Sequence, residues 1–330
     1  MFFDPIMIAL ARKRNGGSGG STGGGGSTEE WFNDGDTHIW ISLPEGRTSP
    51  MLGCCPNGTV TVDWGDGTEP NVIRGSSTGY FNFTPTHNYA KPGNYVITLR
   101  VDGEVAFGGI NNTNEYSLIL RHSSSANAIN NVYRNAVQKI EIGNNVTEIN
   151  NYAFHSCNAL TDITISGSVT RIGENAFTYC HALSSVTIQN GVKSISSYAF
   201  QYCYGSSSVT IPASVTSIGY GAFYYCYSLL SITFPEGVTS IGGNAFYYCK
   251  SLSSVTIPGS VTNIAANTFY GCSSLRFCDF SNHTSIPTLA AYNAFSDVAG
   301  DCQILVPATL HGEWKEKTNW IALASKIVPV

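Results

Sequence analysis

The fold of this chain is decided by one stretch, Leu252-Ser253-Ser254-Val255-Thr256-Ile257-Pro258-Gly259-Ser260-Val261-Thr262-Asn263-Ile264-Ala265-Ala266-Asn267-Thr268-Phe269-Tyr270-Gly271-Cys272. Its pattern recurs every 23 residues, and the Phe-x-x-Cys pair that ends it occurs six times, at Phe154/Cys157, Phe177/Cys180, Phe200/Cys203, Phe223/Cys226, Phe246/Cys249 and Phe269/Cys272. A fixed period of this length predicts a solenoid in which each repeat forms one coil. Solenoids present extended binding surfaces, so the repeat favours a binding protein over an enzyme.

Within one repeat, Val255 and Ile257 alternate with Ser254 and Thr256. This alternation predicts a strand with apolar residues inside and hydroxyls outside. Coils stacked at about 4.8 Å would align the outward residues in rows. One row holds Thr164, Thr187, Thr210, Thr233 and Thr256, and the other Ser185, Ser208, Ser231 and Ser254. Threonine has a high β propensity, so such a row can serve simply to stabilise the strands. The alternative is that the row contacts a ligand.

The repeat resembles the BspA-like class of leucine-rich repeat, with the motif LxxVxIPxxVTxIGxxAFxxC. This class is found in bacterial surface proteins and in proteins of bacteriophages and prophages, so the resemblance implies one of these settings. Two departures stand out. Ser206 replaces the first leucine of its repeat, and Cys278-Asp279-Phe280 replaces the usual Val-Thr-Ile in the last one.

Tyrosine gathers at the variable positions of the repeat, between Phe and Cys and directly after Cys. Antibody paratopes favour such a composition, because tyrosine gives a large amphipathic contact area at low entropic cost. The alternative is that the rings pack over neighbouring coils and seal the solenoid edge. The candidate ligand-binding residues, called the tyrosine ridge below, are Tyr179, Tyr202, Tyr204, Tyr224, Tyr225, Tyr227, Tyr247 and Tyr248.

Residues 31–103 contain short alternating runs between turn residues, which predict a β-sandwich. The stretch from Val62 to Thr68, VDWGDGT, and the later HNYA-x-PGNY from His87 resemble the PKD domain. That resemblance implies an immunoglobulin-like spacer or contact module without catalysis. Asp66-Gly67 predicts a type I′ hairpin. Calcium binding is an alternative role for Asp34, Asp36, Asp63 and Asp66, but aspartates more often stabilise turns, and we expect no metal.

The N-terminus predicts an anchor helix over residues 1–15, with a disordered start as the alternative, followed by a flexible Gly/Ser linker over 16–30. Asp4-Pro5 is a helix start. Basic residues follow the apolar ones, which is the reverse of a secretory signal. The anchoring stripe comprises Phe2, Phe3, Ile6, Met7 and Leu10.

Composition limits the function. Only 12% of the 330 residues are charged and the net charge is −5, so nucleic acid is not an expected partner, and no apolar run is long enough for membrane insertion. We expect the six repeat cysteines to be buried free thiols, with Cys278 and Cys302 as the one candidate disulfide pair. No HExxH or GxSxG motif occurs, so we expect neither an enzyme nor a cofactor.

These patterns predict a mainly β protein with an immunoglobulin-like (PKD-like) β-sandwich, then a connector and N-terminal cap over 104–136, leucine-rich repeats over 137–285 and a C-terminal cap over 286–330. Trp314, Trp320 and Ile327 are the expected cap residues. The predicted function is a non-enzymatic bacteriophage display or adhesion protein on the virion surface, assembled in the host cytoplasm. Its N-terminal segment would bind virion proteins and its solenoid a host protein or glycan. The alternatives are a bacterial cell-surface adhesin and a purely structural spacer, and self-association stays open.

Overall fold

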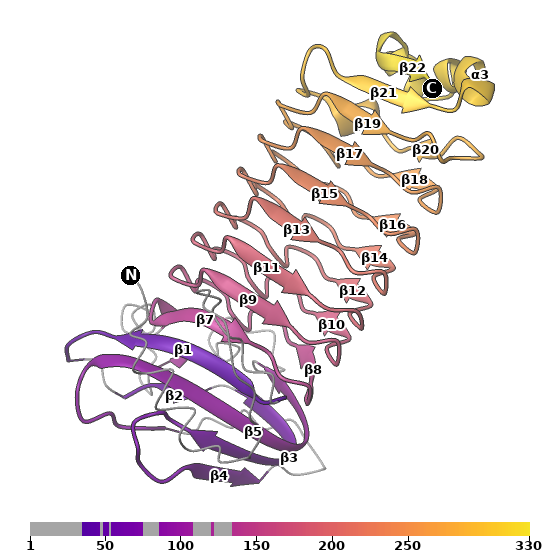
Figure 1. Ribbon diagram of the computed structural model, residues 1–330. Coiled ribbons are helices and arrows are strands. Elements are labelled where there is room, and N and C mark those ends of the chain that lie inside the picture. Colours follow the sequence, from indigo (N-terminus) through magenta and orange to yellow (C-terminus); the bar gives the residue numbers. More distant parts are fainter. Residues whose placement is uncertain (1–34, 47–48, 53, 75–85, 108–119, 122–133) are drawn as a thin grey trace, which may run out of the picture.

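The structure, a computed structural model, describes residues 35–46, 49–52, 54–74, 86–107, 120–121 and 134–330. A small sheet at the N-terminal end leads into a long solenoid, and a helical cap closes the far end (Figure 1). No helix within these residues is long and apolar enough to cross a membrane. The predicted anchor and linker, residues 1–30 with Phe2, Phe3, Ile6, Met7 and Leu10, lie outside the described residues.

Two parallel ladders of strands build the solenoid, because each 23-residue coil contributes one strand to each ladder. The first ladder contains β7 (Val137–Glu141), β9 (Asp162–Ile165), β11 (Ser185–Ile188), β13 (Ser208–Thr210), β15 (Ser231–Thr233), β17 (Ser254–Thr256), β19 (Phe277–Asp279), β21 (Gln303–Val306) and β22 (Ile327–Pro329). The second contains β8 (Val146–Ile149), β10 (Arg171–Ile172), β12 (Ser194–Ile195), β14 (Ser217–Ile218), β16 (Ser240–Ile241), β18 (Asn263–Ile264) and β20 (Thr288–Leu289). Equivalent residues of successive coils face each other, as Thr233 faces Thr256. The solenoid predicted from the period is confirmed.

The core of the solenoid is a column of stacked phenylalanine rings. Neighbouring rings from Phe154 to Phe269 lie 5.0–5.5 Å apart and within 9° of parallel. Phe295 extends the column with a ring 5.5 Å from that of Phe269. The six repeat cysteines are fully buried beside it as free thiols, as predicted.

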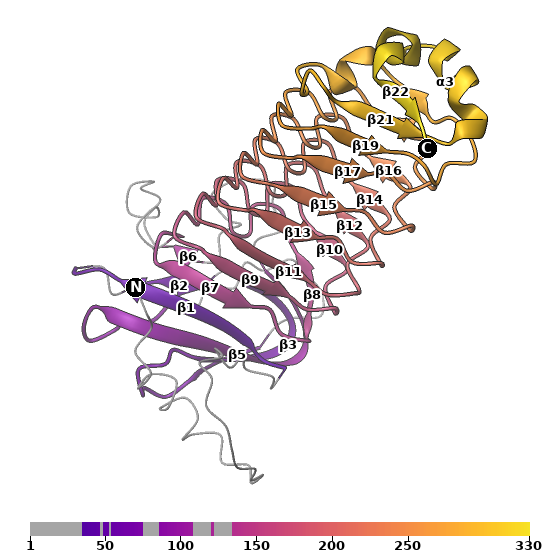
Figure 2. The ribbon, with the colours of Figure 1, turned by 45° about the horizontal axis from the view of Figure 1, so that its top comes forward.

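The N-terminal sheet continues directly into the solenoid. Its strands are β1 (Thr37–Leu43), β3 (Cys54–Asp63), β4 (Asn71–Arg74) and β5 (Gly93–Phe107), paired antiparallel in the order β4-β3-β5-β1. β1 also pairs antiparallel with β7, and the end of β5 pairs in parallel with β8, so both ladders gain a strand (Figure 2). These strands cover the first coil. Of the predicted cap over 104–136, only residues 104–107, 120–121 and 134–136 are described.

Short strands β2 (Met51–Leu52) and β6 (Leu120–Arg121) form a separate antiparallel pair. The strands expected from the short alternating runs within residues 31–103 are present as β1, β3 and β5. The described residues give one broad sheet and this pair, so the second layer of the predicted sandwich stays a prediction.

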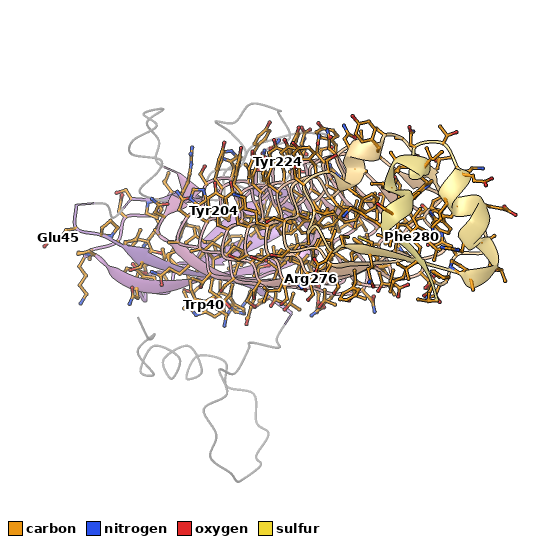
Figure 3. All side chains as sticks on the ribbon, turned by 90° about the horizontal axis from the view of Figure 1, so that it is seen from above. Trp40, Glu45, Tyr204, Tyr224, Arg276 and Phe280 are labelled. Atoms are coloured by element: carbon orange, nitrogen blue, oxygen red, sulfur yellow. The ribbon has the colours of Figure 1, made fainter. Side chains whose placement is uncertain are left out.

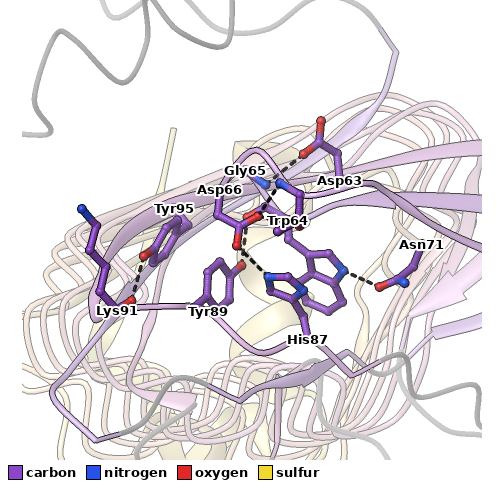
Figure 4. Close-up of polar contacts among 10 residues, drawn as sticks. Asp63, Trp64, Gly65, Asp66, Asn71, His87, Tyr89, Lys91 and Tyr95 are labelled. Carbon is purple, nitrogen blue, oxygen red and sulfur yellow. Dashed lines mark hydrogen bonds and ion pairs between the residues drawn. The ribbon is translucent and has the colours of Figure 1, made fainter.

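A compact polar cluster follows β3 (Figure 4). The Trp64 ring stacks on the His87 ring at 4.9 Å, and His87 Nε2 lies 2.8 Å from Asp66 Oδ2. Tyr89 Oη donates to the Trp64 carbonyl oxygen (2.9 Å). The type I′ hairpin prediction is wrong, because Gly65 and Gly67 have positive φ whereas Asp66 does not, and β4 begins only at Asn71.

Those aspartates of the possible calcium site that the structure describes stabilise the fold instead. Asp63 Oδ1 accepts a bond from the Gly65 backbone amide, and Asp66 Oδ1 accepts from the amide and hydroxyl of Thr68. Asp36 forms an ion pair with Arg100. Asp34 lies outside the described residues. The three described carboxylates therefore act in turns and an ion pair.

The C-terminal cap buries two tryptophans over the last coil. It consists of η1 (Tyr292–Phe295), η2 (Ala308–Leu310), α3 (His311–Glu316) and η3 (Trp320–Lys326), with β21 and β22. Trp314 and Trp320 are fully buried, Ile327 nearly so, and Trp320 Nε1 donates to the Pro287 carbonyl oxygen (2.8 Å). The two tryptophans belong to separate short helices, α3 and η3, and Asn319 between them has a φ of 64°.

Candidate binding surface

The tyrosine ridge lies on the turns that follow the second ladder. In each coil, the residue before Cys adopts a left-handed backbone conformation, with φ of 64° at Tyr179, 58° at Tyr202, 59° at Tyr225 and 56° at Tyr248. Side chains other than glycine and asparagine are uncommon there, because Cβ approaches the backbone closely. The turn repeats in every coil, so the tyrosines align.

Tyr179, Tyr202, Tyr225 and Tyr248 form one stacked column. The ring centroids of successive members are 4.8, 5.3 and 5.2 Å apart, and the ring planes differ by 6°, 15° and 1°. Such offset stacking contributes about 0.5–1.5 kcal/mol per pair beyond burial. The ring faces are therefore covered by neighbouring rings.

Two further columns flank the first. His181, Tyr204 and Tyr227 stack at 4.8 and 5.1 Å, directly after the cysteines. Tyr224 and Tyr247 stack at 4.8 Å, directly after the phenylalanines. Edge contacts tie the columns together, as between Tyr225 and Tyr227 at 5.4 Å and between Tyr224 and Tyr225 at 4.6 Å. All eight predicted residues thus form one continuous surface.

The ridge remains partly open to solvent. Tyr179 is 39% exposed and the other seven are intermediate between buried and exposed. Because stacking covers their faces, the rings offer mainly edges and phenolic hydroxyls to a partner. Aromatic edges carry partial positive charge and phenols both donate and accept hydrogen bonds, so the surface suits an oxygen-rich ligand.

Sequence reasoning omitted three neighbours of the ridge. Tyr270 stacks on Tyr247 at 5.0 Å, and a hydrogen bond to Asp297 raises the pKa of Tyr270 to about 12. Lys250 Nζ lies 4.8 Å from the centre of the Tyr227 ring, a cation–π contact. His181 is the first ring of the column that continues with Tyr204 and Tyr227. All three occupy the repeat positions of ridge tyrosines, so the period itself could have identified them.

The His155 and Cys157 side chains do not form a nucleophile–base pair. Burial raises the pKa of the Cys157 thiol to about 12, and burial together with the Arg134 guanidinium lowers the pKa of His155 to about 4. His155 Nδ1 instead contacts Ser156 Oγ at 2.8 Å. Across the part of the chain that the structure describes, no group of three or more His, Cys, Asp or Glu could hold a metal ion.

The strand face lies away from the ridge. Figure 3 shows Tyr204 and Tyr224 on one side of the molecule, and Arg276 and Trp40 on the other. Thr187, Thr210, Thr233 and Thr256 are exposed in the predicted row, and Thr164 is half-buried. Leu230 (54% exposed) and Phe277 (47% exposed) interrupt this otherwise hydroxyl-rich face.

Comparison with known proteins identifies the repeat. Residues 103–207, 129–229 and 195–298 match the family described as BspA type leucine rich repeat region. No curated protein matches the chain.

Several solved structures are similar to parts of the chain. A leucine-rich repeat protein of T. pallidum is 27% identical, with 47% of this chain and 83% of that one covered and a TM-score of 0.42. A leucine-rich cell surface protein of Faecalibacterium prausnitzii is 24% identical (49% and 63% covered, TM-score 0.25), and a leucine-rich repeat protein of Eubacterium ventriosum 21% identical (64% and 63% covered, TM-score 0.36). The family matches together span residues 103–298, more than half of the 330 residues, and the chain belongs to the BspA type leucine-rich repeat family.

Proposed function

We propose that this protein is a non-enzymatic adhesin of the bacterial cell surface that binds a host glycan or glycoprotein through the tyrosine ridge. Membership of the BspA type family supports the setting, because the resemblance noted above implies surface proteins of bacteria. The PKD-like N-terminal sheet would act as a rigid base, since β1 and β5 pair with the first strands of the solenoid.

One observation carries the assignment to the ridge. The left-handed position before each cysteine is filled by Ser156 in the first complete coil and by Gly271 in the sixth, with φ of 62° and 73°. The phenylalanine column runs unbroken through both coils. The fold therefore does not require tyrosine there, and each tyrosine in this conformation costs on the order of 1 kcal/mol. Stacking offsets much of this cost, and the ring edges and phenolic hydroxyls that stay open to solvent support a role in recognition.

The test uses soluble mucin and cultured epithelial cells as probes. Changing Tyr202, Tyr225 and Tyr248 together to Ala should abolish binding to both, with an unchanged circular dichroism spectrum. Changing Thr187, Thr210 and Thr233 to Val should leave binding intact. The opposite pattern would assign recognition to the strand face, and no binding by the unaltered chain to cells, mucin or a glycan array would favour the spacer function.

A virion-associated role is a second proposal, favoured by the Asp4-Pro5 helix start and the apolar stripe at Phe2, Phe3, Ile6, Met7 and Leu10. In that setting residues 1–15 would attach the chain to a phage particle, and the ridge would face the host. Deleting residues 1–14 should then leave a folded chain that no longer co-sediments with virions. Detection of the chain in washed cell envelopes, and its absence from purified virions, would favour the adhesin.

A further inference from the structure

Cys278 and Cys302 lie together where the last coil meets the C-terminal cap. Cys278 belongs to β19 and Cys302 directly precedes β21, and these strands pair in parallel with Cys278 opposite Ile304. Both side chains point into the core, 0% and 3% exposed. Both are free thiols, and each thiol shifts the pKa of the other, so the two groups interact. Two buried, interacting thiols therefore lie on or directly beside paired strands at the joint between solenoid and cap.

The repeat cysteines are arranged differently. From the second to the sixth repeat, each thiol donates to the carbonyl oxygen of the phenylalanine one coil earlier, as Cys272 Sγ does to Phe246 (3.1 Å). Their S–H groups are thereby directed at the backbone. Cys278 and Cys302 interact with each other instead.

A lysine supports the turn that carries Cys302. The Cys302 amide donates to the Ala299 carbonyl oxygen (3.0 Å), and Lys326 Nζ donates to the carbonyl oxygens of Ala299 (3.3 Å) and Gly300 (3.2 Å). The neighbouring Cys278 thiol and the Lys326 ammonium lower the pKa of the Cys302 thiol, whereas burial raises the pKa of Cys278. Because thiolates are the attacking species in disulfide exchange, Cys302 should react first.

We propose that Cys278 and Cys302 form a disulfide that fastens the cap to the solenoid when a small-molecule or protein disulfide is present as oxidant. The Cys302 thiolate attacks one sulfur of the oxidant, forming a mixed disulfide and releasing a thiolate that takes up a proton. The Cys278 thiolate then attacks the Cys302 sulfur and releases the second thiol. The chain loses two electrons and two protons, which the oxidant gains. Since both sulfurs are buried, the exchange should take place as the cap docks during folding.

Such a bond would act at the weakest point of the architecture. In solenoids each coil contacts only its neighbours, so unfolding begins readily at the ends. A link between residues 278 and 302 would hold the cap in place and restrict the unfolded chain. This inference does not depend on the ligand of the tyrosine ridge.

The experiment refolds the full chain from urea, once with a mixture of oxidised and reduced glutathione and once with excess reductant. Free thiols are then alkylated, and an unreduced digest is analysed by mass spectrometry. We expect a Cys278–Cys302 cross-linked peptide in the unaltered chain and in the repeat control Cys226→Ala, but not in Cys302→Ala. The oxidised chain should melt several degrees higher than the reduced chain, and Cys302→Ala should lose this difference.

Three results would each overturn the proposal: alkylation of both cysteines after oxidative refolding, a link to any other cysteine, or a stable mixed disulfide of Cys302 with glutathione. The cross-link in the unaltered chain decides the question even if Cys302→Ala fails to fold, and Cys278→Ala provides a second variant for the melting comparison.

Discussion

The Sγ atom of Cys226 donates a hydrogen bond to the carbonyl oxygen of Phe200 in the preceding coil, at 3.1 Å. The same bond joins Cys249 to Phe223 at 3.2 Å. The phenylalanine column and the cysteine column are therefore coupled at every step, one by ring stacking and the other by a thiol-to-backbone bond. This coupling explains why the Phe-x-x-Cys pair recurs without exception through six repeats.

Replacing Phe223 with Ala should destabilise the solenoid strongly. The side chain is 1% exposed and stacks on rings on both sides, at 5.4 Å each. Lost burial and the resulting cavity should cost about 3–5 kcal/mol of the free energy of unfolding, measured by urea titration. Tyr225→Ser, at the ridge surface of the same coil, should cost much less. Equal costs for the two variants would place the ring column outside the core.

Gly271 should resist substitution because of its neighbour Tyr248. It has φ of +73°, and an added Cβ would lie 2.8 Å from Tyr248 Cδ1. We expect Gly271→Ala to cost about 1–2 kcal/mol in a urea titration, with a shift of the Tyr248 ring. Gly312→Ala is the control, since an added Cβ there meets no atom within 4 Å. It should leave stability unchanged or slightly raised, and a similar loss in both variants would refute the explanation.

His155 should make stability depend on pH. Burial, followed by the Arg134 guanidinium, lowers the pKa of His155 from 6.5 to about 4. The unfolded chain therefore binds a proton at this residue before the folded chain does. The stability that depends on neutral His155 is fully present above pH 6.5. As the pH falls toward 4, the free energy of unfolding decreases progressively, by on the order of 3 kcal/mol.

The measurement compares the free energy of unfolding of the unaltered chain and of His155→Gln between pH 7 and pH 4. The variant should lose less stability over this range. The pKa values of His181 and His283 are also lowered, but these residues are present in both chains, so the difference isolates His155. Parallel curves would contradict the prediction.

The sequence predicted the repeat well because its period imposes one geometry on every coil. The inward positions of Val255 and Ile257, the buried cysteines and the grouping of the ridge tyrosines all follow from alignment at 23 residues. The stacking of the ridge rings could not be predicted, because it depends on the left-handed φ at Tyr202 and its equivalents. The amino-acid sequence does not show this backbone conformation. The pairing of β1 with β7 also escaped prediction, because nothing local in Thr37–Leu43 indicates a partner about 100 residues away.

The phenolic hydroxyls of the ridge should contribute most of the binding. Changing Tyr202, Tyr225 and Tyr248 together to Phe preserves the stacked rings and removes three hydrogen-bonding groups. Each lost bond is worth about 0.5–1.5 kcal/mol, so the loss of three should lower the affinity for soluble mucin roughly 10- to 1,000-fold with little change in stability. Affinity equal to that of the unaltered chain would show that ring edges alone suffice.

The central claim is that the ridge itself touches the ligand, and hydroxyl-radical footprinting of the full chain with and without soluble mucin tests this most directly. We predict that mucin lowers the oxidation of Tyr179, Tyr202 and Tyr225. Oxidation of Tyr220 and Tyr292, which are 46% and 59% exposed and lie outside the ridge, should stay unchanged. Saturating mucin that leaves the ridge tyrosines as reactive as before, or that protects Leu230 and Phe277 on the strand face instead, would contradict the account.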